Sequence, residues 1–224
     1  MYKRQGVIEE VGSEVNLFKV GDRVTHASMP IGAYSEKQIM PEEKLVSVPD
    51  GVSDEVASCI TLKGITAEYL LHRAYPLKKG DKVLYHAAAG GLGQILCPWA
   101  NALGAEVIGT VGSKAKEEIA KKNGCHHVIN YTEKNFVEEV EKIFGKNSID
   151  VVYDGVGTKT FKGSIETLKI RGMMVAFGNA SGYVDTIDVK KDINAKGLFF
   201  TRPSIAHYTI CLLYTSDAAD DQAC

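Results

Sequence analysis

From residue 82 onward, short apolar runs alternate with longer segments in which apolar residues recur at helical spacing. The short runs predict β-strands at residues 83–85, 106–111, 127–130, 149–153, 173–177 and 197–200. The longer segments have Lys/Glu faces and predict α-helices at residues 92–103, 114–123, 134–144 and 160–168. A glycine that favours a left-handed cap stands near each helix end, at Gly104, Gly124, Gly145 and Gly172. This alternation predicts a doubly wound parallel sheet with helices on both faces.

The N-terminal part has a different pattern, of short alternating runs bounded by turn residues. These runs predict strands or sheet edges at residues 6–11, 21–24, 32–36 and 45–49. The segment is too short to bury a core alone, so we expect part of a β-rich domain. Ser53 is placed to cap a helix, and residues 66–73 predict a second helix, which ends at Tyr75-Pro76. The predicted division is a partial β-rich domain at 6–62, an α/β domain at 63–200, and a return to the first domain at 201–210.

Both ends of the chain look like foreign sequence. Residues 1–5 and the beginning of residues 211–224 correspond to one short DNA element translated in opposite orientations. That element resembles a transposase sequencing adaptor. We therefore expect residues 1–5 and 211–224 to be non-native adaptor translation that flanks a fragment of a longer gene, and we exclude them from fold reasoning.

Composition and charge narrow the class of protein. Hydrophobic residues make up 45% of the chain and the formal net charge is −2, which argues against a nucleic-acid or anionic-membrane partner. No apolar run approaches the roughly 20 residues that span a bilayer. Outside the expected foreign tail, Cys59, Cys97 and Cys125 are widely spaced, unlike a disulfide framework or a four-cysteine zinc lobe. We expect each to be a small buried residue in a reducing, cytoplasmic setting.

The stretch after residues 83–85 carries the first chemical signal. Ala87, Gly90 and Gly93 form the pattern A-x-x-G-x-x-G between a predicted strand and a predicted helix. The first two are expected to allow a tight turn and close approach to a pyrophosphate, and Gly93 to let the helix pack on the strand. The helix N-terminus would offer free N–H groups to phosphates. Together these features indicate the phosphate-binding corner of a Rossmann domain.

The segment after the next strand indicates which dinucleotide would bind. A NAD site has an acidic residue about 20 positions after the first glycine, but residues 109–116 contain none. Ser113 and Lys116 can bind a 2′-phosphate, which a carboxylate would repel. Tyr131, after the third strand, is placed to cover the adenosine end. The alternative is an ordinary helix start in which Ser113 caps and the lysines are solvated. We predict a preference for NADP(H).

Several strings in combination resemble a known family. They are residues 62–67, 86–93, 109–113, 128–131, 153–157 and 177–182. Together they resemble the NADPH:quinone oxidoreductases, the zeta-crystallin-like, zinc-independent branch of the medium-chain dehydrogenase/reductase superfamily, over essentially all of residues 6–210. The resemblance implies a partial GroES-like catalytic domain beside a Rossmann domain, in a cytoplasmic homodimer. The implied reaction is NADPH-dependent reduction of a quinone.

The resemblance also implies two groups of cofactor-binding residues. The group for the pyrophosphate, the 2′-phosphate and the adenosine is Gly91 and Leu92, then Gly112, Ser113 and Lys116, then Tyr131. The group that lines the nicotinamide side is Tyr69, Val156 and Asn179. The cofactor carries the redox step in such an enzyme, so the catalytic residues, if any, stay unknown.

Zinc is not expected. Zinc-dependent relatives place a cysteine four residues before the threonine that corresponds to Thr66, and this chain has Leu62 there. His86 is expected to be a hydrogen-bonded structural residue. His126 and His127 would face opposite ways in an extended segment, which makes them a poor metal pair.

Two other functions stay open. An NADPH-dependent reductase of enones or enoyl thioesters would share the same nucleotide domain. A non-catalytic NADP(H)- or RNA-binding protein is the second alternative. Single-stranded RNA sites combine a basic groove with aromatic stacking, and the near-neutral charge and scattered aromatic residues argue against one.

Overall fold

The computed structural model describes residues 5–27, 30–206 and 208, in two compact units. One unit is the chain up to Thr66 with the segment from Ile205 on, and the other is Ala67–Ser204. The expected adaptor residues 1–4 and 211–224 lie outside the described residues. The assignment of residues 6–62, 63–200 and 201–210 to particular domains stays a prediction.

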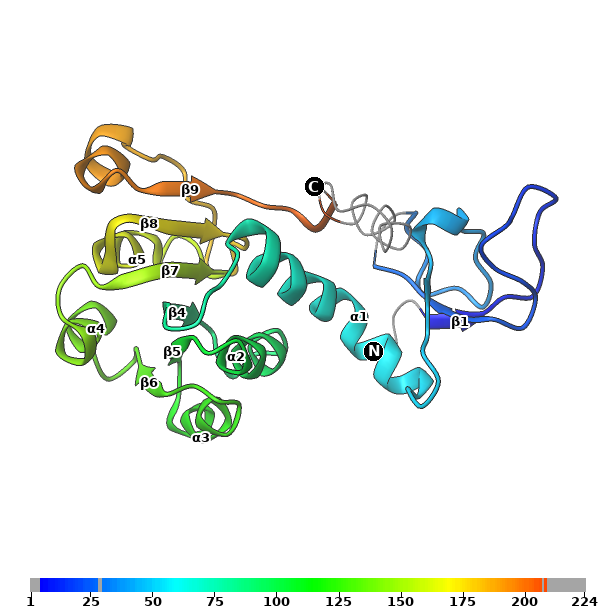
Figure 1. Ribbon diagram of the computed structural model, residues 1–224, viewed down its shortest axis with the longest axis horizontal. Helices are drawn as coiled ribbons and strands as arrows, with labels where there is room; N and C mark the ends of the chain where they lie inside the picture. Colours follow the sequence, from blue (N-terminus) through cyan, green and yellow to red (C-terminus); the bar gives the residue numbers. More distant parts are fainter. Residues whose placement is uncertain (1–4, 28–29, 207, 209–224) are drawn as a thin grey trace. The chain divides into compact units, whose positions relative to one another are not determined.

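The second unit is built on one parallel sheet of six strands. Its order is β6-β5-β4-β7-β8-β9 (Figure 1). The strands are β4 (Lys82–His86), β5 (Glu106–Val111), β6 (His127–Asn130), β7 (Ile149–Asp154), β8 (Leu168–Ala176) and β9 (Phe199–Thr201). The strand order reverses between β4 and β7, where doubly wound sheets bind ligands beyond the carboxyl ends of the strands. The predicted fold class is confirmed.

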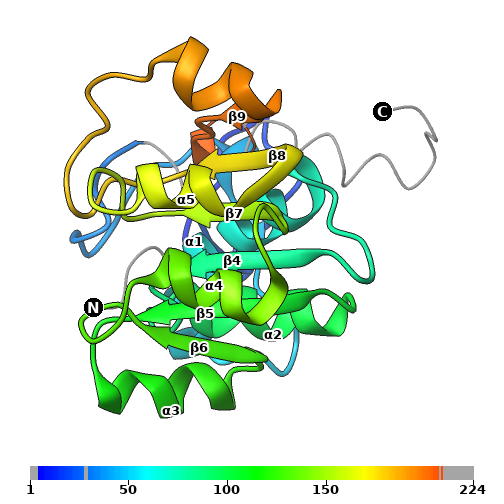
Figure 2. The same cartoon turned by 90° about the vertical axis from the view of Figure 1, so that its left-hand side faces the viewer.

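Helices cover both faces of this sheet (Figure 2). They are α2 (Gly93–Ala102), α3 (Lys114–Lys122), α4 (Phe136–Phe144) and α5 (Phe161–Thr167). Leu84 and Val152 point to the face of α4 and α5, where they join a buried cluster with Val140 and Phe161. Tyr153, one position on, points the other way and donates from Oη to the Leu70 carbonyl, 3.1 Å. The near-continuous apolar strands are therefore buried on both faces, as a parallel sheet requires.

One helix end differs from its prediction. Gly104, Gly124 and Gly145 follow α2, α3 and α4 with φ between 84° and 88°, a positive value that favours glycine at a helix end. Gly145 has ψ 173° and is therefore extended rather than left-handed helical. Gly172 does not cap a helix, because α5 ends at Thr167 and the chain passes directly into β8. The left-handed residue there is Arg171, at φ 60°.

The first unit contains a small antiparallel sheet. It comprises β1 (Gln5–Val7), β2 (Arg23–Thr25) and β3 (Val46–Ser47), in that order. The prediction of a strand at 32–36 is wrong: the Ser35 amide and hydroxyl both donate to the Gly32 carbonyl, at 3.1 and 2.6 Å, and close a turn.

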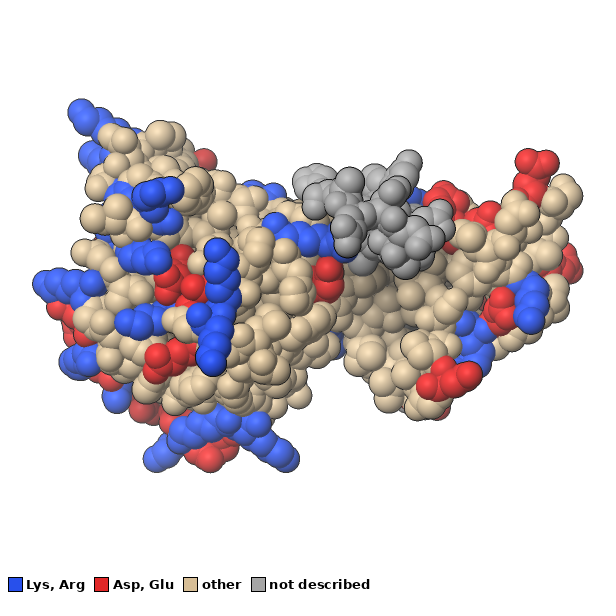
Figure 3. All heavy atoms as spheres, viewed as in Figure 1, with Lys and Arg blue, Asp and Glu red and all other residues tan. Residues whose placement is uncertain are grey.

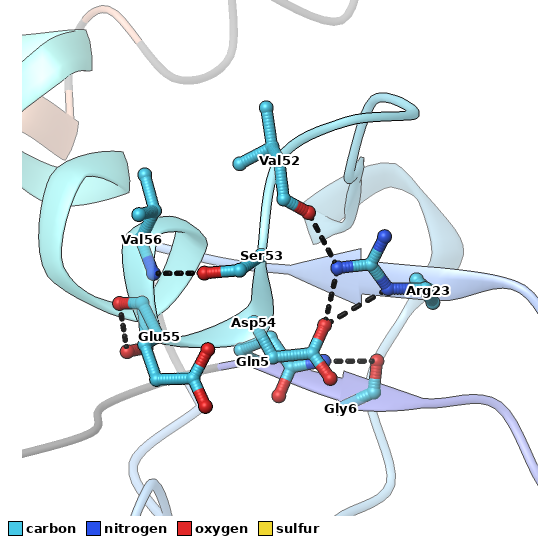
Figure 4. A network of polar contacts seen from close by, with 9 residues as sticks. Gln5, Gly6, Arg23, Val52, Ser53, Asp54, Glu55 and Val56 are labelled. Atoms are coloured by element: carbon cyan, nitrogen blue, oxygen red, sulfur yellow. Dashed lines mark hydrogen bonds and ion pairs between the residues drawn. The ribbon is translucent and has the colours of Figure 1, made fainter.

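The two helices predicted on either side of residue 60 are one helix, α1 (Asp54–Tyr69), which continues into the π-helical turn η2 (Leu70–Ala74). Ser53 caps it as predicted, because its Oγ accepts from the Val56 amide, 3.3 Å. Figure 4 shows how this helix start is fixed to β2. Arg23 donates from Nε to Asp54 Oδ1, 2.9 Å, and from Nη2 to the Val52 carbonyl, 2.6 Å.

Two surface properties bear on function. None of the helices in the described part of the chain is both long and apolar enough to cross a membrane. In the view of Figure 3, acidic side chains lie among the basic ones of the sheet unit, and basic side chains project from the edge that carries α3. Cys97 and Cys125 are buried as expected, whereas Cys59 is exposed on α1, contrary to expectation.

Candidate functional site: the carboxyl edge of the sheet

The loop after β4 makes a tight turn immediately beyond the strand. Ala87 has a left-handed backbone with φ 64°, a conformation that costs a non-glycine residue about 1–2 kcal/mol. Its carbonyl accepts from the Gly90 amide, 2.8 Å, while the Ala88 amide donates to the Thr110 carbonyl of β5, 3.0 Å. A Cβ at Gly90 would lie 3.0 Å from the Ala87 oxygen. The small residues therefore permit this turn.

Gly93 brings α2 against the same loop. A Cβ at Gly93 would lie 2.3 Å from the Ala88 carbonyl oxygen and 2.9 Å from the Ala88 Cα. Both are backbone atoms, so no side-chain movement relieves the clash. This close approach places the first turn of α2 directly over the end of β4.

Two backbone amides of this turn are free to bind an anion. The N–H groups of Gly91 and Leu92 donate to no backbone or side-chain acceptor among the described residues. Gly91 is exposed and Leu92 half-buried. Unpaired amides at the start of a helix carry partial positive charge and bind phosphate groups well.

The segment after β5 forms the next part of this edge. Tyr131, which follows β6, lies over Gly112: a Cβ at Gly112 would be 2.5 Å from the Tyr131 Oη. Ser113 is the N-cap residue of α3, yet its side chain makes no capping hydrogen bond. The alternative reading is therefore wrong in making Ser113 a side-chain cap. Its other part, solvated lysines, agrees with the structure, because Lys114 and Lys116 are exposed.

The loops after β7 and β8 lie interlocked on the other side of the switch point. The Val156 carbonyl accepts from the Ser181 amide, 2.7 Å, and from its hydroxyl, 2.9 Å. A Cβ at Gly157 would be 3.2 Å from the Asn179 Cα. Val156 and Asn179, both half-buried, are thus brought together. Tyr69 comes from a separate element, the last residue of α1, and is buried.

A buried polar chain connects these strand ends, and we call it the switch-point chain. Its members are Thr110 of β5, His86 of β4, Ser164 of α5 and Asp154 of β7, each no more than 1% exposed. The Thr110 Oγ1 lies 2.9 Å from His86 Nδ1, His86 Nε2 lies 2.9 Å from Ser164 Oγ, and Ser164 Oγ donates to Asp154 Oδ2, 3.1 Å.

Asp154 is the end point of this chain. Its carboxylate also accepts from the amides of Val156 and Gly157, at 2.8 and 3.0 Å, and from the Thr160 hydroxyl, 2.7 Å. Burial lowers the pKa of His86, against an opposing effect of the Asp154 charge. A neutral His86 fits the hydrogen bonds described. The prediction that His86 is hydrogen-bonded structure is confirmed.

Sequence reasoning missed Asp154 as an organising residue. It belongs to the string 153–157, which was used only for its family resemblance. The available signal was a carboxylate at the end of an otherwise apolar buried strand, since buried charged residues are rarely without a role.

His126 and His127, the adjacent pair considered as metal ligands, make separate contacts. His126 Nδ1 accepts from the Val107 amide, 3.0 Å, and His127 Nε2 lies 3.4 Å from Glu106 Oε1. Within the residues that the structure describes, no three side chains of His, Cys, Asp or Glu gather as metal ligands would.

The chain belongs to the zinc-binding dehydrogenase family, whose model matches residues 91–220, and so to the medium-chain dehydrogenase/reductase superfamily. Among its relatives, 2-haloacrylate reductase of a Burkholderia species is 49% identical over 210 residues, which are 92% of this chain and 63% of that protein. Quinone oxidoreductase 1 of Escherichia coli K12 is 45% identical over 91% of this chain and 62% of that protein. The chain thus spans about three fifths of these relatives.

The fold comparison agrees. A crystal structure of Escherichia coli quinone oxidoreductase complexed with NADPH superposes with a TM-score of 0.89, at 40% identity. The superposition covers 97% of this chain and 68% of that one.

Proposed function

We propose that the chain is the nucleotide-binding part of an NADPH-dependent oxidoreductase that reduces quinones without zinc. The observation that carries the proposal is the carboxyl edge at the strand-order reversal, where free amides follow β4 and a segment without acidic residues, 112–116, follows β5. The relatives named quinone oxidoreductase, and the solved complex of one of them with NADPH, support it.

The residues present fit the cofactor. The free N–H groups of Gly91 and Leu92 suit a pyrophosphate. The Ser113 hydroxyl, which α3 does not use, and the Lys116 ammonium suit a 2′-phosphate. Tyr131, half exposed over Gly112, presents a ring for the adenosine end. Val156, Asn179 and Tyr69 are proposed to line the nicotinamide side.

NADPH, when bound, supplies the reducing equivalents for the substrate. The chain's own residues bind the phosphates, orient the nicotinamide edge against the acceptor and keep water away. Leu62, which stands where zinc-dependent relatives have a cysteine, supports a reaction without zinc. A cytoplasmic homodimer of the whole protein, acting on a small-molecule quinone without a nucleic-acid partner, completes the proposal.

A second substrate class has a specific observation in its favour. A relative at 49% identity is a 2-haloacrylate reductase, and 2-haloacrylate is an α,β-unsaturated acid. An NADPH-dependent reductase of activated C=C bonds is therefore the alternative. Steady-state oxidation of NADPH with a benzoquinone, an enone and 2-chloroacrylate in parallel separates the two, because each class predicts turnover with its own acceptor.

The cofactor assignment is tested by calorimetric titration of the chain with NADPH and NADH. We expect the chain to bind NADPH at least tenfold more tightly than NADH. In Lys116→Ala, the affinity for NADPH should fall severalfold, toward the affinity for NADH. Lys122→Ala, in the last turn of the same helix, is the matched control and should bind like wild type. Equal affinity for both nucleotides would contradict the 2′-phosphate pocket, and binding of neither would contradict the cofactor site.

A further inference from the structure

The switch-point chain ties three strand ends together in one run of hydrogen bonds. Thr110 lies two residues before Gly112, and His86 directly precedes Ala87. Asp154 directly precedes the loop that contains Val156. The His86–Ser164 contact joins positions 78 apart in the sequence. The phosphate side and the proposed nicotinamide side of the site therefore share one buried polar connection.

The direction of each hydrogen bond follows from the acceptor at the end. A carboxylate only accepts, so Ser164 donates its single hydroxyl proton to Asp154. Ser164 Oγ must then accept from a protonated His86 Nε2. The neutral ring leaves Nδ1 as an acceptor, and the Thr110 hydroxyl donates to it. All donors in the switch-point chain thus point toward Asp154. His86 is therefore the neutral tautomer with its proton on Nε2.

Asp154 fixes the Val156 peptide from one side and the β8 loop fixes it from the other. The Val156 and Gly157 amides both donate to Asp154 Oδ1, at 2.8 and 3.0 Å. The amides of Ala180 and Ser181 donate to the carbonyls of Gly155 and Val156, at 3.2 and 2.7 Å. The segment that carries Asn179 therefore rests on backbone that the Asp154 carboxylate holds in place.

We propose that the switch-point chain is a positioning device for the nicotinamide half of the cofactor. Asp154 is its positioning residue, acting through Val156 and Asn179 without touching the cofactor. This inference rests on the proposed function, because it assigns the loops after β7 and β8 to the nicotinamide. The switch-point chain sets the distance between the loops after β7 and β8 and the proposed phosphate-binding loop after β4. These two regions would hold the two ends of one ligand.

The test compares two ligands that differ only in the nicotinamide. The full chain is titrated by calorimetry with NADPH and with 2′-phospho-ADP-ribose, which has the same phosphates and adenosine. Ser164→Ala removes the acceptor of His86 and one donor to Asp154. We expect it to weaken NADPH binding about tenfold and to leave 2′-phospho-ADP-ribose binding within twofold, because binding groups held out of place lose their advantage.

Two further variants separate positioning from stability. Thr110→Val removes the hydroxyl that donates to His86 and should weaken NADPH binding selectively, whereas Thr110→Ser keeps that hydroxyl and should restore it. Thr167→Val is the matched control, since this buried hydroxyl on α5 donates to the Ser164 carbonyl, 2.8 Å, outside the chain. It should lower stability without a selective loss of NADPH affinity.

Each outcome decides the proposal. Equal weakening of both ligands in Ser164→Ala, or no weakening of either, would overturn the positioning role and leave the proposed function standing. A selective loss in Thr167→Val as large as in Ser164→Ala would also overturn it. If the wild-type chain binds neither ligand, the proposed function fails and the inference fails with it.

Discussion

The loops after β4 and β7 lie on either side of the strand-order reversal, yet they are shaped in opposite ways. Residues 87–93 are shaped by the lack of side chains, which lets the backbone turn and α2 approach. Residues 155–157 are shaped by one buried carboxylate, which accepts from the amides of Val156 and Gly157. The first loop leaves its Gly91 and Leu92 amides open to an anion, whereas the Val156 and Gly157 amides of the second are occupied by Asp154. The proposed phosphate site and the proposed nicotinamide wall follow from this difference.

Asp154→Ala should have the largest effect, because it removes the carboxylate that shapes the β7 loop. Two amides and two hydroxyls would lose their buried acceptor, and each unsatisfied buried group costs about 1–3 kcal/mol unless it finds another partner. We expect a loss of about 4 kcal/mol in the free energy of unfolding, measured by urea denaturation.

Asp188→Ala is the matched control for that carboxylate. Asp188 also accepts from two amides, of Lys190 and Lys191, at the start of a helical turn, but its side chain is 45% exposed. Water can replace it, so the expected loss is about 1 kcal/mol. Similar losses in the two variants would show that burial of Asp154 is not what shapes the β7 loop.

The β4 loop has its own critical position, Gly93. In Gly93→Ala the new methyl group would meet the Ala88 backbone at 2.3–2.9 Å, which forces α2 away from the strand end. Overpacking of this kind costs about 3 kcal/mol. Gly64→Ala in α1, where a Cβ meets nothing within 4 Å, should instead be neutral or stabilise by up to about 1 kcal/mol. A urea midpoint for Gly93→Ala equal to wild type would refute the close approach.

The two loops also differ in how far the sequence could predict them. Ala87, Gly90 and Gly93 stand in one local pattern whose spacing has a physical meaning, so the loop and the parallel sheet around it were predicted. The Asp154 network joins residues from β5, β4, α5 and β7, and no local spacing encodes such pairings. Gly172 was misassigned for a related reason: α5 and β8 are joined without a loop, and glycine alone does not distinguish a cap from a bend within a strand.

His86, which links the end of β4 to Asp154 of β7 through Ser164, gives the stability of the chain a pH dependence. Burial holds the pKa of His86 below its usual value in the folded chain, while the unfolded chain keeps about 6.5. Below that pH the unfolded state binds a proton that the folded state does not, so stability falls as pH drops, by up to about 1.4 kcal/mol per unit for one proton. Above it, both states are neutral and the contribution is constant.

The measurement is the free energy of unfolding between pH 7.5 and 5, in wild type and His86→Gln. The variant should lose this part of the slope. Parallel curves for wild type and His86→Gln would mean that His86 takes up its proton at the same pH in the folded and unfolded states, which contradicts a pKa lowered by burial.

The smallest effect is expected at Ala87, in the turn after β4. Ala87 is strained at φ 64°, so Ala87→Gly relieves about 1 kcal/mol while adding a similar or smaller entropy to the unfolded chain. The net result should be a stabilisation of up to about 0.5 kcal/mol. Ala89→Gly, two residues on and without a positive φ, gains only the unfolded-state entropy and should lose about 0.7 kcal/mol.

The opposite signs of these two substitutions matter more than their sizes, because the same chemical change is made twice in one loop. Paired urea midpoints of Ala87→Gly and Ala89→Gly resolve the difference. If Ala87→Gly is the less stable of the two, the left-handed turn is not strained, and the loop after β4 is shaped by something other than the lack of side chains. If it is the more stable, the chain keeps an alanine where glycine would be more stable, and the strain lies at the turn that presents the free amides of Gly91 and Leu92.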